Sequence, residues 1–389
     1  MRILTLSTLF PNPVQPGLGV NVARQVGRIA GTDDMHPVVI APLPRFPIPL
    51  LRSFGPAPYA GLASVPAERR EGENQVEVHH PRYASVPKAG WRWHGEAVAR
   101  AILPLARSLH DRQPFDLIAC EYFFPDAWVA FRLSRALHLP YTVKARGSDI
   151  RYWRHRARAR RQIVTAGRYA KGLLAVSMAL KDDMAAMGLP RERIDVHHTG
   201  VDLDRFTPQA APKAETPLLV CAGNLVPLKR VRLIIEALSA LPEYRLQIIG
   251  DGPQCAALEA LAAARGVADR TEFLGRIDHA ELPARFAAAH ALVHASESEG
   301  LANVWVEALA CGTPVITTAV GGAADVVTRG AGVLLDPDTS PMEIARAVRS
   351  VTAGNANAEA ARAAASRFSW DSNIEMLRDH YARVSGAAG

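Results

Sequence analysis

The sequence has few cysteines and no long apolar run. Its 389 residues include four cysteines, none in a C-x-x-C pair: Cys120, Cys221, Cys255 and Cys311. This scatter argues against a disulfide framework, a structural zinc site and a dithiol redox centre. No stretch approaches the roughly 18 to 20 apolar residues that cross a bilayer, and Pro11 interrupts the apolar start before a signal-peptide core is complete. These absences favour a protein of the reducing cytoplasm without a membrane-spanning segment.

Charge is unevenly distributed along the chain. Hydrophobic residues make up 49% and charged residues 21% of the sequence, which excludes disordered and collagen-like classes. The net charge is +7: residues 1–210 contain 29 Lys and Arg against 18 Asp and Glu, whereas residues 211–389 contain 16 against 20. A basic half indicates an anionic partner, which is nucleic acid, anionic lipid or a phosphorylated ligand.

Short apolar runs alternate with amphipathic stretches in two successive series, as in βα units on a parallel sheet. The first series predicts strands at residues 3–7, 38–41, 117–120, 141–144, 173–176 and 194–197. The second predicts strands at residues 218–222, 246–249, 272–274, 291–295, 314–317 and 332–335. We therefore predict an α/β protein with two Rossmann-like domains, and a final helix near residues 370–384.

The boundary between the two series is predicted at residues 207–216, where two prolines and several small residues separate them. The N-terminal domain then covers residues 1–206, the C-terminal domain residues 217–368, and the last helix residues 369–389.

The most informative segment is residues 296–317. Glu299 precedes a predicted helix, and Glu307 lies more than one turn inside it. Gly300 permits a tight turn, and the unpaired N–H groups at residues 302–304 attract a phosphate. The two carboxylates are suited to accept hydrogen bonds from the neutral hydroxyls of a sugar or a ribose. A surface glutamate before an ordinary buried helix is the alternative, but an unpaired Glu307 in so apolar a helix would be costly.

Here the sequence resembles the retaining GT-B glycosyltransferases of the large family that includes sucrose synthases, mannosyltransferases and exopolysaccharide enzymes. Their signature, E-x7-E followed by A-x-A-x-G-x-P-V, is matched by Glu299, Glu307, Ala308, Ala310, Gly312, Pro314 and Val315. Further family elements occur in the usual order at residues 221–229, 248–253, 273–275, 279–282 and 321–325. The resemblance is dense in the C-terminal half and thinner in the N-terminal half. It implies two domains that face each other across a cleft, with the last helix returning to the N-terminal domain.

The resemblance also implies the site residues. Glu299 holds hydroxyls of the donor sugar, Glu307 the ribose, and Lys229 the diphosphate. The family's diphosphate arginine is replaced by the neutral Asn224, so Lys229 is the leading cation and Arg230 a substitute. The full donor-binding prediction is Gly19, Asn224, Lys229, Arg230, Gly250, Glu299, Gly300, Leu301, Asn303, Val304 and Glu307.

Two N-terminal elements complete the resemblance. Gly19 belongs to a glycine-rich loop that in the family packs against the diphosphate, and it lies too far from the first strand for a dinucleotide fingerprint. Arg146 replaces the histidine of the family's H-G-x-D motif. It can stabilise a leaving phosphate but not accept a proton, and the alternative is a strand-end arginine paired with Asp149. The predicted catalytic residues are Glu299, Lys229 and Arg146.

No metal or other cofactor is expected. In the family the leaving diphosphate helps to deprotonate the acceptor, which needs no enzymic nucleophile, and the sequence offers no Ser/His/Asp arrangement. Asp202 and Asp204 form a D-x-D pattern, but they follow a strand end at the predicted boundary, so we do not assign them a metal.

Residues 151–161 contain six arginines and two aromatic residues. This basic run is either a solvated face or a contact with anionic lipid headgroups or a lipid-diphosphate acceptor. Nucleic acid is not expected, because no binding module accompanies the run.

The function predicted from the sequence is a glycosyltransferase of the hexosyltransferase type. It would transfer a sugar from a UDP- or GDP-type donor to a sugar, lipid-linked or small-molecule acceptor in polysaccharide or glycolipid assembly, in the cytoplasm or on the inner face of the membrane. The alternatives are a sugar-nucleotide epimerase of the same fold and a non-catalytic nucleotide-sugar-binding protein.

Overall fold

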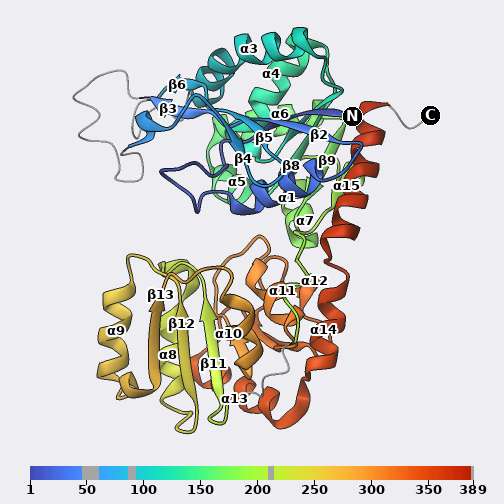
Figure 1. The fold of residues 1–389 in the computed structure, drawn as a ribbon. Helices are drawn as coiled ribbons and strands as arrows, with labels where there is room; N and C mark the ends of the chain where they lie inside the picture. The colour runs from blue at the N-terminus through green and yellow to red at the C-terminus, as the bar shows by residue number, and fades with distance from the viewer. Residues whose placement is uncertain (46–60, 86–92, 209–213, 387–389) are drawn as a thin grey trace. The chain divides into compact units, whose positions relative to one another are not determined.

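The chain folds into two compact units (Figure 1). The computed structural model describes residues 1–45, 61–85, 93–208 and 214–386. Unit 1 contains residues 1–197 and 374–389, and unit 2 contains residues 198–373. Residues 198–206, assigned to the first domain from sequence, lie in unit 2 because Phe206 is buried in its core. Part of the predicted linker, residues 209–213, lies outside the described residues.

Unit 1 is built on an eight-stranded sheet in the order β10-β9-β8-β7-β1-β2-β5-β4. Neighbouring strands are parallel except β4, which pairs antiparallel with β5. The strands are β1 (Arg2–Leu6), β2 (His36–Ile40), β4 (Glu68–Glu71), β5 (Val76–His79), β7 (Leu117–Cys120), β8 (Tyr141–Ala145), β9 (Gly172–Ala175) and β10 (Ile194–Val196). A separate parallel pair joins β3 (Leu43–Arg45) to β6 (Arg82–Ala84).

The helices of unit 1 include the C-terminal helix of the chain. They are α1 (Val20–Ala30), α3 (His94–Arg112), α4 (Trp128–Leu137), α5 (Ser148–Arg151), α6 (Ala157–Tyr169), α7 (Met178–Ala186) and most of α15 (Trp370–Ser385). In α15, Leu377 and Tyr381 are fully buried, and His380 Nε2 lies 2.7 Å from Thr142 Oγ1 of β8. This helix therefore completes the core of unit 1.

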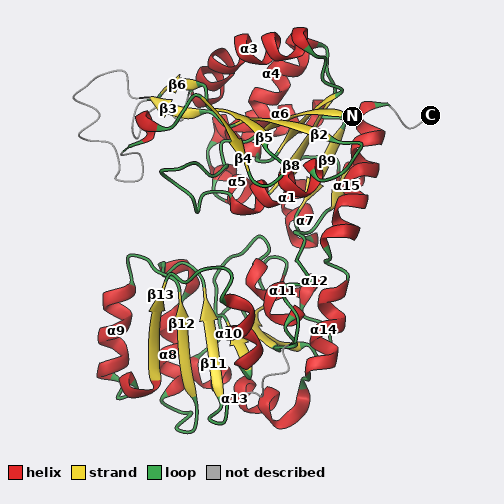
Figure 2. Cartoon of the chain, in the orientation of Figure 1, coloured by secondary structure: helices red, strands yellow, loops and turns green. Residues whose placement is uncertain are grey.

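Unit 2 is built on a six-stranded parallel sheet in the order β13-β12-β11-β14-β15-β16, part of which is visible as yellow arrows in Figure 2. Its strands are β11 (Leu218–Ala222), β12 (Arg245–Ile249), β13 (Thr271–Gly275), β14 (Ala291–Val293), β15 (Val315–Thr318) and β16 (Gly332–Leu335). Its helices are α8 (Val231–Leu238), α9 (Cys255–Ala264), α10 (Leu282–Ala288), α11 (Asn303–Ala310), α12 (Ala323–Val326), α13 (Pro341–Ser350) and α14 (Ala358–Ser366).

These elements confirm the predicted α/β class and the two Rossmann-like domains. The strands at residues 117–120, 218–222 and 332–335 have the predicted bounds, and the other predicted strands are present with ends shifted by one or two residues. Strands β3, β4, β5 and β6 were not predicted. In unit 2 the core lies on both faces of the sheet, which is the burial that continuous apolar strands require.

Candidate functional site

The predicted donor residues of unit 2 gather at one edge of its sheet. Strands β11 and β14 are parallel neighbours, so their carboxyl ends lie side by side. Ligands of open α/β sheets bind at this edge. The segment after β11 carries Asn224 and Lys229, and the segment after β14 carries Glu299 and leads into α11. The sheet thus brings together residues that are far apart in sequence.

Lys229 and Glu299 form a direct ion pair. Lys229 Nζ donates to Glu299 Oε1 at 2.5 Å, and the two side chains are 22% and 12% exposed. A charge-assisted hydrogen bond between mostly buried groups fixes both side chains strongly. Because an ammonium has three N–H donors, Lys229 can hold this carboxylate and also donate to a bound anion.

Arg230 is engaged with the backbone. It adopts a left-handed conformation (φ 46) at the start of α8. Its Nε donates to Ala295 O at 2.6 Å, and its Nη2 donates to Ser296 O at 3.3 Å and Pro337 O at 2.7 Å. The guanidinium therefore ties the segments after β14 and β16 to the start of α8.

Two glycines allow the loops of the site to approach each other. Gly250, after β12, has φ +128, and a Cβ there would lie 2.0 Å from the carbonyl oxygen of Gly223. Gly321, after β15, has φ +56, and a Cβ there would lie 2.0 Å from the carbonyl oxygen of Glu299. Only glycine fits these contacts, so both positions set how closely the loops pack.

Helix α11 begins beside the Glu299 segment without a side-chain cap. Its N-cap is Ala302, and Asn303 and Val304 form the first turn, whose N–H groups have no partner within the helix. Asn303 Oδ1 is buried and has no hydrogen-bond partner in the part of the chain described. Leu301 and Val304 pack partly against the core. The helix start can therefore receive an anion.

Glu307 is buried in α11 and paired. Its side chain is 7% exposed, and its Oε1 lies 3.0 Å from His279 Nε2, on the segment between β13 and α10. The His279 and Phe206 rings also form a T-shaped contact, with 5.2 Å between their centres. The partner that the sequence argument required for Glu307 is thus a histidine.

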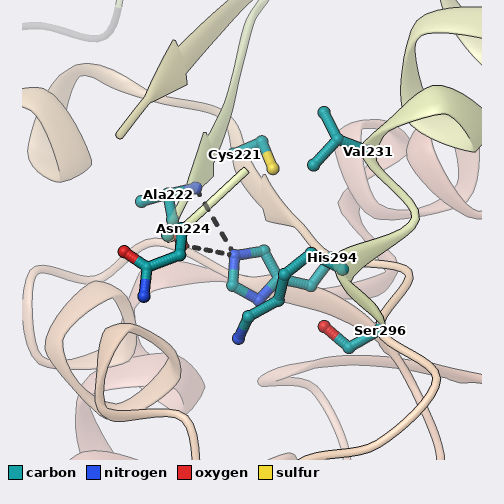
Figure 3. Close-up of a pocket in the computed structure, with 8 residues that line it drawn as sticks. Cys221, Ala222, Asn224, Val231, His294 and Ser296 are labelled. Carbon is teal, nitrogen blue, oxygen red and sulfur yellow. Dashed lines mark hydrogen bonds between the residues drawn. The ribbon is translucent and has the colours of Figure 1, made fainter. Parts of the chain in front are cut away.

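Sequence reasoning missed a buried histidine beneath this site. His294 follows β14, is 3% exposed, and is hydrogen-bonded to Ala222 and Trp305. Figure 3 shows its ring beside Ala222. The ring lines a cavity of about 10 Å³, and Asn224 and Lys229 line the same cavity. That volume is close to what one water needs. The available signal was a histidine within the apolar strand predicted at residues 291–295.

In unit 1, Arg146 belongs to a buried polar network at the carboxyl ends of β7 and β8. Its Nη2 donates to Glu121 Oε2, and its Nε donates to Glu121 O at 3.3 Å. Gln25 of α1 bridges Glu121 to Lys144, whose Nζ also lies 2.6 Å from His197 Nδ1. Burial lowers the pKa of Lys144 well below its usual value.

The structure shows the Asp149 contact of Arg146 through the backbone only, and its role at a leaving phosphate remains a prediction. Its backbone N–H donates to the Asp149 carboxylate at 3.0 Å, but its guanidinium pairs with Glu121. Sequence reasoning did not indicate the Glu121 pairing, because the two residues follow two different strands, β7 and β8.

Gly19 is positioned by a close approach. It caps α1 with φ 64, and a Cβ there would lie 2.1 Å from the carbonyl oxygen of Leu9. The connection between β1 and α1 therefore folds back on itself, with Gly19 close to Leu9.

The basic run spans α5, a short turn of 3-10 helix (Trp153–His155) and the start of α6. Arg151 and Arg154 pair with Asp183, and Arg156 lies over the Tyr152 ring, 4.8 Å from its centre. Three further arginines of the run, Arg158, Arg160 and Arg161, are exposed. In the described part of the chain, no helix is long and apolar enough to cross a membrane.

Among the described residues, one group of side chains has the spacing of metal ligands. Glu68, Glu77 and His79, on β4 and β5, place ligand atoms within 4.8 Å of one another, and Glu68 is exposed. This group lies outside the site of unit 2. Asp202 accepts a hydrogen bond from the Arg205 N–H at 3.1 Å within its own turn.

Comparison with known proteins identifies two family models. Residues 204–368 match the model described as glycosyl transferases group 1, and residues 32–205 match glycosyltransferase family 4. D-inositol 3-phosphate glycosyltransferase of Mycobacteroides abscessus is 37% identical over 208 residues, which is 49% of this chain and 47% of that protein. The enzyme of the same name from Xylanimonas cellulosilytica is 29% identical over 350 residues, 84% of this chain and 76% of that protein. The chain thus spans about half the length of the first relative and three quarters of the second.

A solved structure has the same fold over nearly the whole chain. Anabaena HepE in complex with UDP superposes with a TM-score of 0.73 at 20% identity, over 97% of this chain and 99% of that one. HepE has also been solved with UDP-glucose. At this identity the likeness establishes the fold.

Proposed function

Since the chain belongs to the GT-B glycosyltransferases, with a group 1 domain over residues 204–368, we propose that it transfers a sugar from a nucleotide-diphosphate sugar to a hydroxyl acceptor with retention of the anomeric configuration. The observation that carries the proposal is the Lys229–Glu299 pair beside the start of α11. The UDP and UDP-glucose complexes of HepE support a nucleotide-sugar donor.

Each residue of the proposed donor site has a chemical task. Lys229 and the first N–H groups of α11 neutralise the diphosphate, and Glu299 accepts hydrogen bonds from sugar hydroxyls. Glu307, already held by His279, accepts from the ribose. Asn224 is exposed and supplies hydrogen bonds without charge. Arg230 holds the segments that carry these groups.

In the proposed reaction the bond between the anomeric carbon and the diphosphate oxygen breaks, and a bond from the acceptor oxygen forms on the same face. The acceptor's proton passes to the leaving diphosphate. The protein contributes by holding the substrates in place and by stabilising the negative charge that develops on the leaving group. Lys229 is the cation proposed for that charge.

In unit 1, Arg146 is the residue proposed to help stabilise the negative charge of the leaving diphosphate. Its pairing with Glu121 offsets part of its positive charge. We therefore expect replacement of Arg146 by Gln to reduce transfer less than replacement of Lys229. Gly19, in its tight loop, is proposed to let the backbone approach the diphosphate.

The first test is made on the donor site. Thermal shift with UDP, GDP, ADP and dTDP selects the nucleotide, because a ligand that binds the folded state raises its melting temperature. Turnover is then measured as release of that nucleoside diphosphate from its glucose-carrying form, for example UDP from UDP-glucose. Glu299→Gln and Lys229→Met should each lower turnover about tenfold or more, which corresponds to about 1.4 kcal/mol or more.

The control is Glu297→Gln, which removes an exposed carboxylate two residues from Glu299 and should leave turnover unchanged. Normal turnover in both site variants would refute the site assignment. Incubation of the donor without acceptor distinguishes an epimerase, which would release an isomeric nucleotide sugar. Proton NMR of the transferred sugar reports its anomeric configuration.

For the acceptor, we propose a lipid-linked or saccharide molecule reached from the inner face of an anionic membrane, in polysaccharide or glycolipid assembly. Support comes from Tyr152, which is 57% exposed, and from the exposed arginines of the basic run, which are Arg154, Arg158, Arg160 and Arg161. Cationic and aromatic side chains together suit the lipid headgroup region.

A further inference from the structure

His294 uses both ring nitrogens inside unit 2. The indole N–H of Trp305 can only donate, so His294 Nδ1 is the acceptor of that 3.1 Å hydrogen bond. Nε2 therefore carries the proton and donates to the carbonyl oxygen of Ala222 at 2.9 Å. The Ala222 N–H also lies 3.4 Å from Nε2, but a protonated nitrogen cannot accept from it. The two bonds select one tautomer of a neutral ring and fix its orientation.

The three residues of this network come from the three segments that build the proposed donor site. Ala222 is the last residue of β11, directly before the segment of Asn224 and Lys229. Trp305 is the third residue of α11 and is fully buried. His294 itself lies on the segment that leads to Glu299. One imidazole ring thus connects β11, the Glu299 segment and α11.

The network also lies against the predicted site residues. His294, Lys229 and Ser296 line the same small cavity, and the Ser296 hydroxyl is buried without a hydrogen-bond partner in the described part of the chain. Burial lowers the pKa of His294 to about 4, and the positive charge of Lys229 acts in the same direction. The ring therefore stays neutral at neutral pH and adds no positive charge beside Lys229.

We propose that His294 and Trp305 are positioning residues of the donor site, which hold the Lys229 segment and the start of α11 at the separation that a nucleotide diphosphate requires. This inference rests on the proposed function and adds two residues that do not touch the substrate. It follows that breaking either hydrogen bond weakens diphosphate binding more than the accompanying loss of stability explains.

The test separates the two hydrogen bonds. In His294→Asn the amide oxygen takes the place of Nδ1 and keeps the bond from Trp305, whereas in His294→Gln the amide nitrogen takes the place of Nε2 and keeps the bond to Ala222. Trp305→Phe removes the α11 bond from the other side. The control is Leu258→Ala, which leaves a cavity in the core under α9, a helix that carries none of the three hydrogen-bonded residues.

The measurements are the melting temperature of each full-length variant and its dissociation constant for UDP and GDP by calorimetry. We expect His294→Gln and Trp305→Phe to weaken binding about tenfold or more, because small displacements of charged contacts have large effects. Leu258→Ala should lower the melting temperature and bind as the wild type does. His294→Asn keeps the hydrogen bond from Trp305 of α11, whereas His294→Gln loses it. If this bond contributes more to the position of the site than the bond to Ala222, His294→Asn should bind more tightly than His294→Gln.

The outcomes are distinguishable. Wild-type affinity in His294→Gln and Trp305→Phe, or an equal loss in Leu258→Ala, would overturn the positioning role. If the wild-type protein binds neither nucleotide diphosphate, the proposed function fails and the inference fails with it. If Trp305→Phe does not fold, the two His294 variants still test the inference. Nucleotide-diphosphate affinities equal to that of the wild type in both variants would contradict it.

Discussion

Asp126 makes the stability of unit 1 dependent on pH in an unusual direction. This residue follows β7 and is fully buried. Its Oδ2 accepts a hydrogen bond from the Thr8 backbone N–H at 2.7 Å, while its Oδ1 has no partner in the part of the chain described. Burial, helped by the nearby carboxylate of Asp149, raises the pKa of Asp126 to about 7.

The sign of the effect follows from proton binding. Between pH 3.8 and about 7 the folded state holds a proton that the unfolded state releases, so the free energy of unfolding falls as pH rises through this window. A difference of about three pKa units, at about 1.4 kcal/mol each, corresponds to a loss of about 4 kcal/mol. Asp126→Asn keeps an acceptor for Thr8 and cannot ionise, so it removes this loss.

We therefore expect Asp126→Asn to match the wild type near pH 4 and to exceed its free energy of unfolding by up to about 4 kcal/mol near pH 8. Because the chain has two compact units, hydrogen exchange of the β1 and β7 amides is the measurement that reports unit 1. Asp111→Asn, an exposed carboxylate of the same unit, is the control. A difference between Asp126→Asn and wild type that does not change with pH would refute the buried-carboxylate argument.

Two further predictions concern a glycine and the basic run. Gly250→Ala should destabilise unit 2 by about 1–3 kcal/mol and weaken nucleotide-diphosphate binding, because its Cβ would meet the Gly223 carbonyl; thermal melts and calorimetry check both effects. Replacing Arg158, Arg160 and Arg161 together by Gln should reduce co-sedimentation with anionic vesicles, most strongly at low salt.

Each of these predictions has a matched control. Gly266 also has a positive φ, +66, but a Cβ there meets nothing within 4 Å, so Gly266→Ala should leave binding intact. For the basic run, the control replaces three exposed arginines of unit 2 by Gln: Arg265, Arg329 and Arg346. Equal vesicle binding in both triple variants would leave the basic run as a solvated face.

The parallel strands could be predicted because a strand buried on both faces is a continuous apolar run. The hairpin of β4 and β5 could not. Every residue of β4 (Glu68–Glu71) is charged, and the strand pairs on one side only, with β5. Edge strands carry charge that keeps them from pairing further, so the apolar signal is absent where the sheet ends.

The candidate site was predicted in part, for a related reason. Lys229, Glu299 and Glu307 belong to local motifs that a sequence displays. The bonds of His294 to Ala222 and of Arg146 to Glu121 join segments 72 and 25 residues apart, and nothing in either segment alone indicates its partner. Buried polar pairs of this kind depend on strand order, which sequence spacing does not give.

The route of the chain has a practical consequence for dissecting the protein. Both termini belong to unit 1, and residues 198–373 form one uninterrupted insertion within it. The boundary at residue 373 falls inside α15, so excision or exchange of this insertion would have to leave that helix whole. Truncating the chain ahead of Ile374 would remove Leu377 and Tyr381 from the core of unit 1. The apolar residues that these two side chains cover would then be exposed to solvent.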